Sequence, residues 1–271
     1  LENSWGTAPG FSVSMNSVTV ACFPGVPHEF QSMIHAYIPE ILTTLGVQSQ
    51  EIKEKTLRIF GISESGLQAL LAELPEYEKI RIRSLPHFPE IRLAVSTISD
   101  TNTLDRFLES ARAKLGWRIF SEDPSISYAE TLLNSLGQKE MTLAVAESCS
   151  GGLISQMLTQ IPGASRSFLA GVVSYSNESK SSLLGVPPEI IEEHGAVSEA
   201  TAEFMAKGVQ SRCHSSVGIS ITGIAGPTGG TESKPIGTFF VGLASARGVE
   251  AKRHFFPGLD RLRFQRLAAY V

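Results

Sequence analysis

Residues 142–155 are the stretch that most constrains the fold. They read Thr-Leu-Ala-Val-Ala-Glu-Ser-Cys-Ser-Gly-Gly-Leu-Ile-Ser and open with the apolar run 143–146, which predicts a buried strand. Small and polar residues follow at 147–152, and apolar residues then recur at helical spacing from Leu153. A strand that turns directly into a helix points backbone N–H groups and the positive end of the helix dipole at one spot. The turn also holds hydroxyls and a thiol, so it predicts both an anion site and a nucleophile.

Three further segments place small polar residues next to apolar strands. Residues 172–180 run from a strand into a helix that bears Lys180, residues 195–200 offer Ser198 as a helix cap, and residues 220–230 lead from a strand into a glycine-rich loop. Another strand is predicted at 239–243. In α/β sheets, ligands bind where such loops meet at the strand ends. Residues 125–271 are therefore predicted to form an α/β domain with a ligand site.

Residues 46–124 have a different order of predicted strands and helices, which indicates a separate, smaller module. Strands are predicted at 57–60, 80–83, 91–95 and 117–120, with one helix after Ser63 and another over 104–115. The order β-α-β-β-α-β is typical of a ferredoxin-like or KH-like α+β module. KH modules bind single-stranded nucleic acid through a Gly-x-x-Gly loop, and the sequence has no such loop between the predicted helices. Nucleic acid is therefore not predicted as a partner. In the domain that follows this module, a helix over 128–136 is expected to end at Gly137.

Composition and cysteine usage narrow the class of protein. The 27 acidic and 23 basic residues give a net charge of −4, which argues against strong binding to nucleic acid or anionic membranes. No apolar run approaches the roughly 20 residues of a membrane span. The three cysteines are odd in number and widely spaced, which favours free thiols in a reducing cytoplasm over disulfides or a zinc site. Residues 1–45 predict two strands and one helix, too little to close a core.

Five motifs in the last domain are distinctive, namely Ala146-Glu-Ser-Cys-Ser-Gly-Gly152, Tyr175-Ser-Asn-Glu-Ser-Lys180, Gly195-Ala-Val-Ser-Glu199, Thr222-Gly-Ile-Ala-Gly-Pro227 and Lys234-Pro-Ile-Gly-Thr238. Together and in this order they resemble the C-terminal domain of the CinA family, the nicotinamide mononucleotide (NMN) deamidases. The resemblance implies three domains: the end of an incomplete molybdopterin-binding-like domain at 1–45, a KH-like domain at 46–124, and an α/β sandwich at 125–271. We expect the missing part of the first domain to precede Leu1.

The resemblance also implies an activity, the hydrolysis of NMN to nicotinate mononucleotide and ammonia in pyridine nucleotide recycling. The family uses a serine–lysine mechanism with an assisting tyrosine and no metal or other cofactor. In this sequence the serine corresponds to Ser148, the lysine to Lys180 and the tyrosine to Tyr175. Substrate contacts are expected from Glu147, Ser150, Gly151, Gly152, Asn177, Thr222, Gly223, Ala225, Gly226 and Lys234. The implied assembly is a homodimer. A divalent metal is expected only with an intact N-terminal domain, whose family activity is ADP-ribose pyrophosphatase.

Other interpretations of the same residues remain open at this point. Ser148 and Ser150 could be helix N-caps, Lys180 a solvated surface residue, and Tyr175 a half-buried strand aromatic. Cys149 is the rival nucleophile, although a buried and inert thiol is the preferred interpretation. Either the Ser150–Gly152 turn or the Gly223 loop could form the oxyanion hole. The domain could also bind a nucleotide or phosphosugar without hydrolysing it.

Three basic residues, Arg166, Lys234 and Arg261, are weaker candidates for phosphate contacts. Near the last of them, residues 256–261 read Phe-Pro-Gly-Leu-Asp-Arg, which differs from the family's usual Gly-Asp-Arg by the inserted Leu259. The insertion puts the role of Arg261 in doubt.

Overall fold

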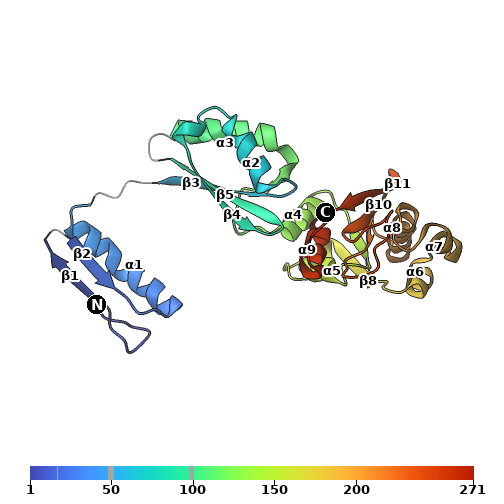
Figure 1. The fold of residues 1–271 in the computed structure, drawn as a ribbon, viewed down its shortest axis with the longest axis horizontal. Helices are drawn as coiled ribbons and strands as arrows, with labels where there is room; N and C mark the ends of the chain where they lie inside the picture. Colours follow the sequence, from blue (N-terminus) through green and yellow to red (C-terminus); the bar gives the residue numbers. More distant parts are fainter. Residues whose placement is uncertain (17, 48–51, 98–100) are drawn as a thin grey trace. The chain divides into compact units, whose positions relative to one another are not determined.

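The computed structural model describes residues 1–16, 18–47, 52–97 and 101–271, which fall into two compact units, Leu1–Ile52 and Lys53–Val271 (Figure 1). The first unit pairs β1 (Phe11–Met15) with β2 (Val18–Cys22) as an antiparallel hairpin, followed by α1 (Pro27–Thr44). Met33 is the buried residue of α1. The apolar side chains of β1 are exposed, so this unit has little core of its own, as its short sequence predicted.

The second unit begins with a four-stranded antiparallel sheet in the order β4-β5-β3-β6. Its elements are β3 (Lys53–Ile59), α2 (Glu64–Ala72), the 3₁₀ turn η1 (Tyr77–Lys79), β4 (Arg81–His87), β5 (Glu90–Thr97), α3 (Thr101–Leu115), the 3₁₀ turn η2 (Gly116–Arg118) and β6 (Ile119–Ser121). The predicted order β-α-β-β-α-β is confirmed. Alternate residues of the central strands, such as Leu57 and Leu93, join Leu67 and Phe107 of the helices in one buried core.

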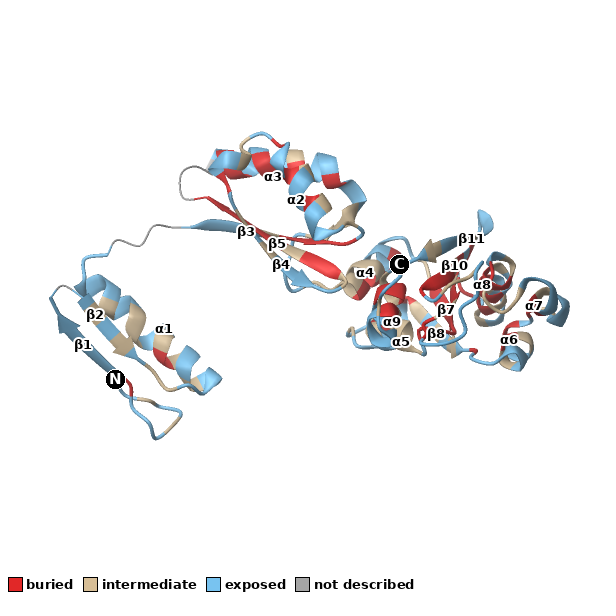
Figure 2. Cartoon of the chain, in the orientation of Figure 1, coloured by how far each residue is buried: buried red, intermediate tan, exposed pale blue. Residues whose placement is uncertain are grey.

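The rest of this unit is built on a five-stranded sheet in the order β11-β10-β9-β7-β8. The strands are β7 (Leu143–Glu147), β8 (Phe168–Val173), β9 (Val217–Gly223), β10 (Thr238–Ser245) and β11 (Gly248–Phe255). β7 runs parallel to β8 and β9, whereas β10 and β11 are antiparallel additions. β7 is buried along its whole length, which explains its continuous apolar sequence (Figure 2).

Helices cover both faces of this sheet. Leu143 and Val145 of β7 join a core with α4 (Tyr128–Gln138) and α5 (Leu153–Thr159), while Ala144 and Ala146 face a second core with α6 (Asn177–Leu184), α7 (Pro188–His194) and α8 (Glu199–Cys213). α9 (Arg261–Tyr270) packs through Phe264 beside Phe239. The short turn η3 (Ala164–Arg166) precedes β8. The arrangement is the mixed α/β fold that the sequence predicted.

Local predictions fared unevenly. The helix expected to end at Gly137 continues to Gln138, and the left-handed residue that follows it is Glu140 with φ 53°. The prediction of Gly137 as a terminator was therefore wrong. Neither α7 nor β11 was predicted. β11 carries charged residues at several exposed positions and lacks the apolar run that marks the buried strands.

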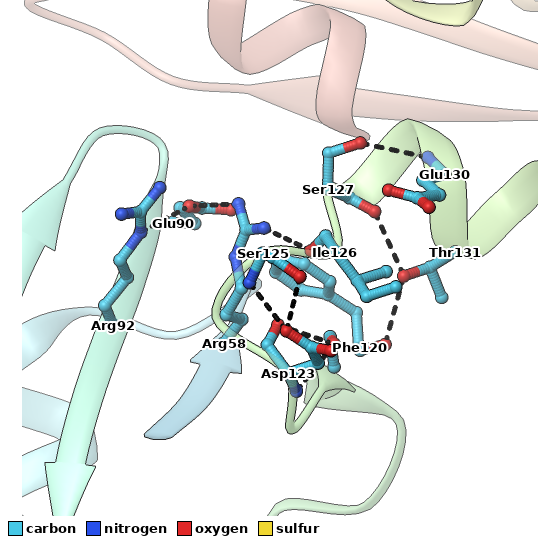
Figure 3. Close-up of polar contacts among 11 residues, drawn as sticks. Arg58, Glu90, Arg92, Phe120, Asp123, Ser125, Ile126, Ser127, Glu130 and Thr131 are labelled. Carbon is cyan, nitrogen blue, oxygen red and sulfur yellow. Dashed lines mark hydrogen bonds and ion pairs between the residues drawn. The ribbon is translucent and has the colours of Figure 1, made fainter. Parts of the chain in front are cut away.

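Arg58, which forms a buried ion pair inside the smaller module, also contacts the segment that leads into the larger domain (Figure 3). Arg58 on β3 pairs with Glu90 on β5 at 2.6 Å, and both side chains are at least nine-tenths buried. The Arg58 guanidinium also donates to the carbonyl oxygen of Ile126, in the segment before α4, and lies 5.0 Å from the centroid of the Phe120 ring. Beside this pair, the rings of Tyr128 and Tyr270 stack with their centroids 5.0 Å apart. None of the described helices is long and apolar enough to cross a membrane.

Candidate active site

Glu147 organises the turn that follows β7. Its side chain is fully buried and accepts five hydrogen bonds at 2.6–3.1 Å, all from residues 150–155. The donors include the N–H groups of Gly152, Ile154 and Ser155, which belong to the start of α5. A helix needs partners for its first N–H groups, and Glu147 supplies them from inside the protein. The predicted substrate contact through Glu147 is therefore replaced by a structural role.

Ser148 and Lys180 form the central pair of the site. Lys180 Nζ lies 3.1 Å from Ser148 Oγ, and both residues are buried, with Lys180 only 2% exposed. Lys180 comes from the first turn of α6, where Ser176 caps the helix through the N–H of Ser179. Its amine also donates to the carbonyl oxygens of Ser174 at 2.9 Å and Tyr175 at 3.3 Å. Burial lowers the pKa of Lys180 from its usual value of 10.5.

The structure excludes the alternative interpretations of Ser148, Ser150 and Lys180. α5 begins after Gly152, which occupies the N-cap position, so Ser148 is not a helix cap. Ser150 is not a side-chain cap either, because its hydroxyl donates to Glu147. Lys180 is not a solvated surface residue. The sequence brings Ser148 and Lys180 together because β7 and β8 are parallel neighbours, so the segments after both strands emerge at the same sheet edge.

Tyr175 lies beside this pair but is largely open to solvent. It follows β8 directly, its side chain is 63% exposed, and its hydroxyl accepts a hydrogen bond from Arg261 at 3.0 Å. Arg261 also donates to the carbonyl oxygen of Gly226 at 2.8 Å. Despite the inserted Leu259, Arg261 therefore reaches the site. Asp260 is the N-cap of α9 and accepts from the N–H of Arg263, which fixes Arg261 at the first position of the helix.

Cys149 is deeply buried beside the nucleophile candidate. Burial raises the pKa of its thiol to about 12, so almost no thiolate forms near neutral pH. The geometry agrees with the interpretation of Cys149 as an inert thiol.

Several other residues predicted to contact the substrate bind other parts of the protein or lie away from the site. Thr222 is buried and donates to the carbonyl oxygen of Ala196 at 2.7 Å. Lys234 donates to the carbonyl oxygen of His194 at 2.6 Å, which holds the glycine-rich loop against the end of α7. Arg166 precedes β8, at the opposite end of the strand from Tyr175, so the suggested phosphate contact there was wrong.

The remaining predicted contacts lie on the loops around the site. Asn177 is exposed at the start of α6, Gly223 ends β9, and Ala225 is buried in the loop after it. Ser148 is tied to this side of the site by its N–H, which donates to the carbonyl oxygen of Ile221 at 3.0 Å.

The turn after Ser148 leaves few backbone donors for a ligand. The N–H of Gly151 donates to the carbonyl oxygen of Ser148, and that of Gly152 donates to Glu147, so neither group is free for the oxyanion hole that this turn was one of two candidates to form. In the described part of the chain, the N–H of Ser150 has no acceptor, and that of Cys149 faces only the sulfur of its own side chain. No cluster of three or more His, Cys, Asp or Glu side chains suited to a metal occurs among the described residues.

Comparison with known proteins places this site in a family. Residues 125–270 match the family model of the CinA C-terminal domain. The chain belongs to the CinA family. A CinA-like protein of Syntrophus aciditrophicus is 40% identical over 97% of this chain and 64% of its own length. A putative competence-damage inducible protein of Caldicellulosiruptor bescii is 37% identical over 99% of this chain and 66% of its own length. The chain thus spans slightly less than two thirds of these relatives.

Solved structures of the CinA superfamily share the fold of about half of this chain. The competence/damage inducible protein CihA from Agrobacterium tumefaciens has a TM-score of 0.51 and 33% sequence identity, over 53% of this chain and 87% of its own. The competence damage-inducible protein A from Klebsiella pneumoniae has a TM-score of 0.51 and 30% identity, over 52% of this chain and 88% of its own.

Proposed function

We propose that the chain is an amidohydrolase that converts NMN to nicotinate mononucleotide and ammonia. The observation that carries this proposal is the 3.1 Å contact between Ser148 Oγ and Lys180 Nζ in a buried setting. A serine hydroxyl attacks an amide only when a base takes its proton, and a lysine is a base only when its amine is neutral. Burial favours the neutral amine because it lowers the pKa of Lys180.

The first half of the reaction acylates Ser148. The Ser148 oxygen attacks the carboxamide carbon of NMN, and its proton passes to Lys180 Nζ. The N–H groups of Ser150 and Cys149 are the donors available for the oxyanion that forms. The tetrahedral intermediate then collapses: the bond from carbon to the amide nitrogen breaks, Lys180 returns the proton to that nitrogen, and ammonia leaves.

The second half releases the product. Water attacks the ester carbon of the acylated serine and gives its proton to Lys180. The ester bond breaks, the proton returns to the Ser148 oxygen, and nicotinate mononucleotide leaves with its new carboxyl group. Lys180 thus acts first as a base and then as an acid in each half.

Arg261 and Tyr175 form the other wall of the proposed site. Tyr175 and Gly226 use two of the donors of the Arg261 guanidinium, which has five N–H groups in all. The remaining donors and the positive charge suit a phosphate group, such as the one NMN carries. We infer that Arg261 holds the phosphate and also fixes the Tyr175 hydroxyl.

The test measures ammonia release from NMN by the wild-type chain and by Ser148→Ala, Lys180→Met and Cys149→Ala. We expect Ser148→Ala to lose turnover, Lys180→Met to lose roughly 10²–10⁴-fold, and Cys149→Ala to retain it. Calorimetric binding of NMN to Ser148→Ala separates catalysis from binding. Wild-type binding without ammonia release would favour a nucleotide-binding module. Turnover kept in Ser148→Ala and lost in Cys149→Ala would transfer the role of nucleophile to the thiol.

A further inference from the structure

One peptide unit of the turn after Ser148 is held by a side chain from a distant part of the sequence. Gln265 of α9 donates from Nε2 to the carbonyl oxygen of Cys149 at 2.9 Å, across 116 positions of sequence. A carbonyl oxygen only accepts hydrogen bonds, so the Gln265 amide presents its NH₂ group at this contact. The peptide unit that begins with this carbonyl ends in the N–H of Ser150, one of the donors that the proposed mechanism uses for the oxyanion.

The bond from Gln265 fixes the direction of the Ser150 N–H. The peptide bond between Cys149 and Ser150 is trans, and the C=O and N–H of a planar trans peptide point in opposite directions. Because the carbonyl is aimed at α9, the N–H is aimed away from it. α9 packs with Cys149 on one face of the sheet, whereas α6, which carries Lys180, packs through Leu184 on the other face. The Ser150 N–H is therefore turned toward the face of the sheet on which Lys180 lies.

Two contacts hold the peptide unit between Cys149 and Ser150. The Ser150 hydroxyl donates to Glu147 at 2.7 Å, which fixes the side chain of Ser150 but leaves the peptide unit before it able to rotate. The bond from Gln265 removes this rotation. Within the described residues, no second donor to the Cys149 carbonyl oxygen is present. The orientation of the Ser150 N–H thus depends on Gln265.

Helix α9 holds Gln265 in place. Phe264 and Ala268 are buried, with exposed fractions of 1% and 2%, so the helix cannot turn about its axis without unpacking them. Arg261 lies four residues before Gln265, and residues at this spacing share one face of a helix. Arg261 contacts Tyr175 from that face. A single face of α9 therefore places both the guanidinium proposed to hold the phosphate and the amide that orients the backbone donor.

We propose that Gln265 is a positioning residue of the reaction, whose bond to the Cys149 carbonyl aims the Ser150 N–H at the oxygen that becomes negatively charged. The proposal rests on the proposed function, since this oxyanion forms only when Ser148 attacks an amide. The carboxamide oxygen gains its charge during the attack and not on binding. The contribution of Gln265 therefore falls on kcat and leaves KM unchanged.

The test compares Gln265→Met, which keeps the length of the side chain and removes the donor, with Gln156→Met. Gln156 is exposed and lines the same cavity of about 750 Å³ as Gln265, so it supplies a matched control. Ammonia release from NMN gives kcat and KM. Removal of a whole oxyanion donor costs roughly 10²–10³-fold in kcat, and a misdirected donor costs less. We expect Gln265→Met to lose roughly 10–100-fold in kcat at an unchanged KM, and Gln156→Met to match the wild type.

Two readouts separate positioning from general support of the turn. General disturbance would also raise KM and displace the rising limb of kcat/KM, because that limb reports Lys180, whereas a misdirected backbone donor changes neither. Urea unfolding measures any loss of stability on its own. An unchanged kcat in Gln265→Met, with or without a loss of stability, would overturn the proposal. A lower kcat together with a raised KM or a displaced limb would likewise overturn it.

A measurement without substrate keeps this proposal apart from the proposed function. The NMR resonance of an amide nitrogen responds to a hydrogen bond at the carbonyl of its own peptide unit. The Ser150 amide of the labelled full chain should therefore shift in Gln265→Met and stay in place in Gln156→Met. A shift in a chain that releases no ammonia would support the orientation of the peptide and remove both the deamidase and the role of Gln265 in it. Ammonia release with an unmoved Ser150 resonance would refute the role of Gln265 and leave the deamidase standing.

Discussion

Replacing Gly208 by alanine tests how the fold sets the position of Lys180. Gly208 lies inside α8, where a β-carbon would overlap the carbonyl oxygen of Leu184 and lie 2.8 Å from the carbon that bears it. Leu184 is the last residue of α6, the helix that carries Lys180 one turn earlier. The added methyl meets backbone, which cannot rotate away as a side chain can. α6 as a whole therefore has to move.

Two opposing effects decide the outcome. Alanine in place of glycine stabilises a helix interior by up to about 1 kcal/mol. Overpacking of a tight contact typically costs about 1–3 kcal/mol, and here the only relief is a shift of α6 on the order of 1 Å. We expect a net loss of about 1–2 kcal/mol in the free energy of unfolding. The same shift would lengthen the 3.1 Å contact between Ser148 and Lys180, and a misplacement of about 1 Å lowers a rate roughly 10²-fold.

Gly137→Ala supplies the matched control. Gly137 also lies inside a helix, but a β-carbon there would meet only the Ser167 hydroxyl at 3.8 Å, an ordinary contact. This variant should gain stability and keep its turnover. Urea unfolding and ammonia release from NMN would be measured for both variants. Wild-type turnover in Gly208→Ala would refute the argument that the contact between α8 and α6 positions the lysine.

Four further predictions concern the buried groups. Because burial lowers the pKa of Lys180, the folded chain loses this proton at a lower pH than the unfolded chain. The free energy of unfolding should therefore rise with pH between the lowered pKa of the folded chain and the ordinary pKa of the unfolded chain. Urea unfolding at several pH values should show this rise in the wild type and not in Lys180→Met. The rising limb of kcat/KM should report the same lowered pKa. Iodoacetamide at pH 8 should label the exposed Cys22 quickly and Cys149, with its pKa of about 12, only after unfolding, as peptide mass spectrometry can check. Arg58→Met should cost about 3–5 kcal/mol in urea unfolding because it leaves the Glu90 charge buried, whereas Arg58→Met with Glu90→Leu should cost less.

The sequence predicts the elements of this fold better than the roles of its polar residues. The apolar run before Ser148 and the helical spacing after it are local signals, and both correspond to observed elements. The order of elements in the smaller module is likewise visible in its periodicity. By contrast, β11 has no apolar pattern because it lies at a solvated edge, and α7 has only seven residues, too few to show a period.

The site was predictable where the family resemblance supplies a role. The resemblance selects Ser148 and Lys180, and the structure brings them within hydrogen-bond distance. The partners of Glu147 could not be predicted, since a carboxylate before a turn can face a ligand or a helix start equally well. Arg261 reaches Tyr175 across 86 positions of sequence, a contact that no local pattern encodes. The available signals were the partial match to the family's Gly-Asp-Arg and Asp260, a helix-capping residue directly before Arg261.

Helix α9 connects the candidate active site with the smaller module. Its first residue, Arg261, donates a hydrogen bond to the Tyr175 hydroxyl. Its last residue, Tyr270, stacks on Tyr128 and packs against Phe60 of the smaller module. Ten helical residues make a stiff rod of about 15 Å, so both ends shift together.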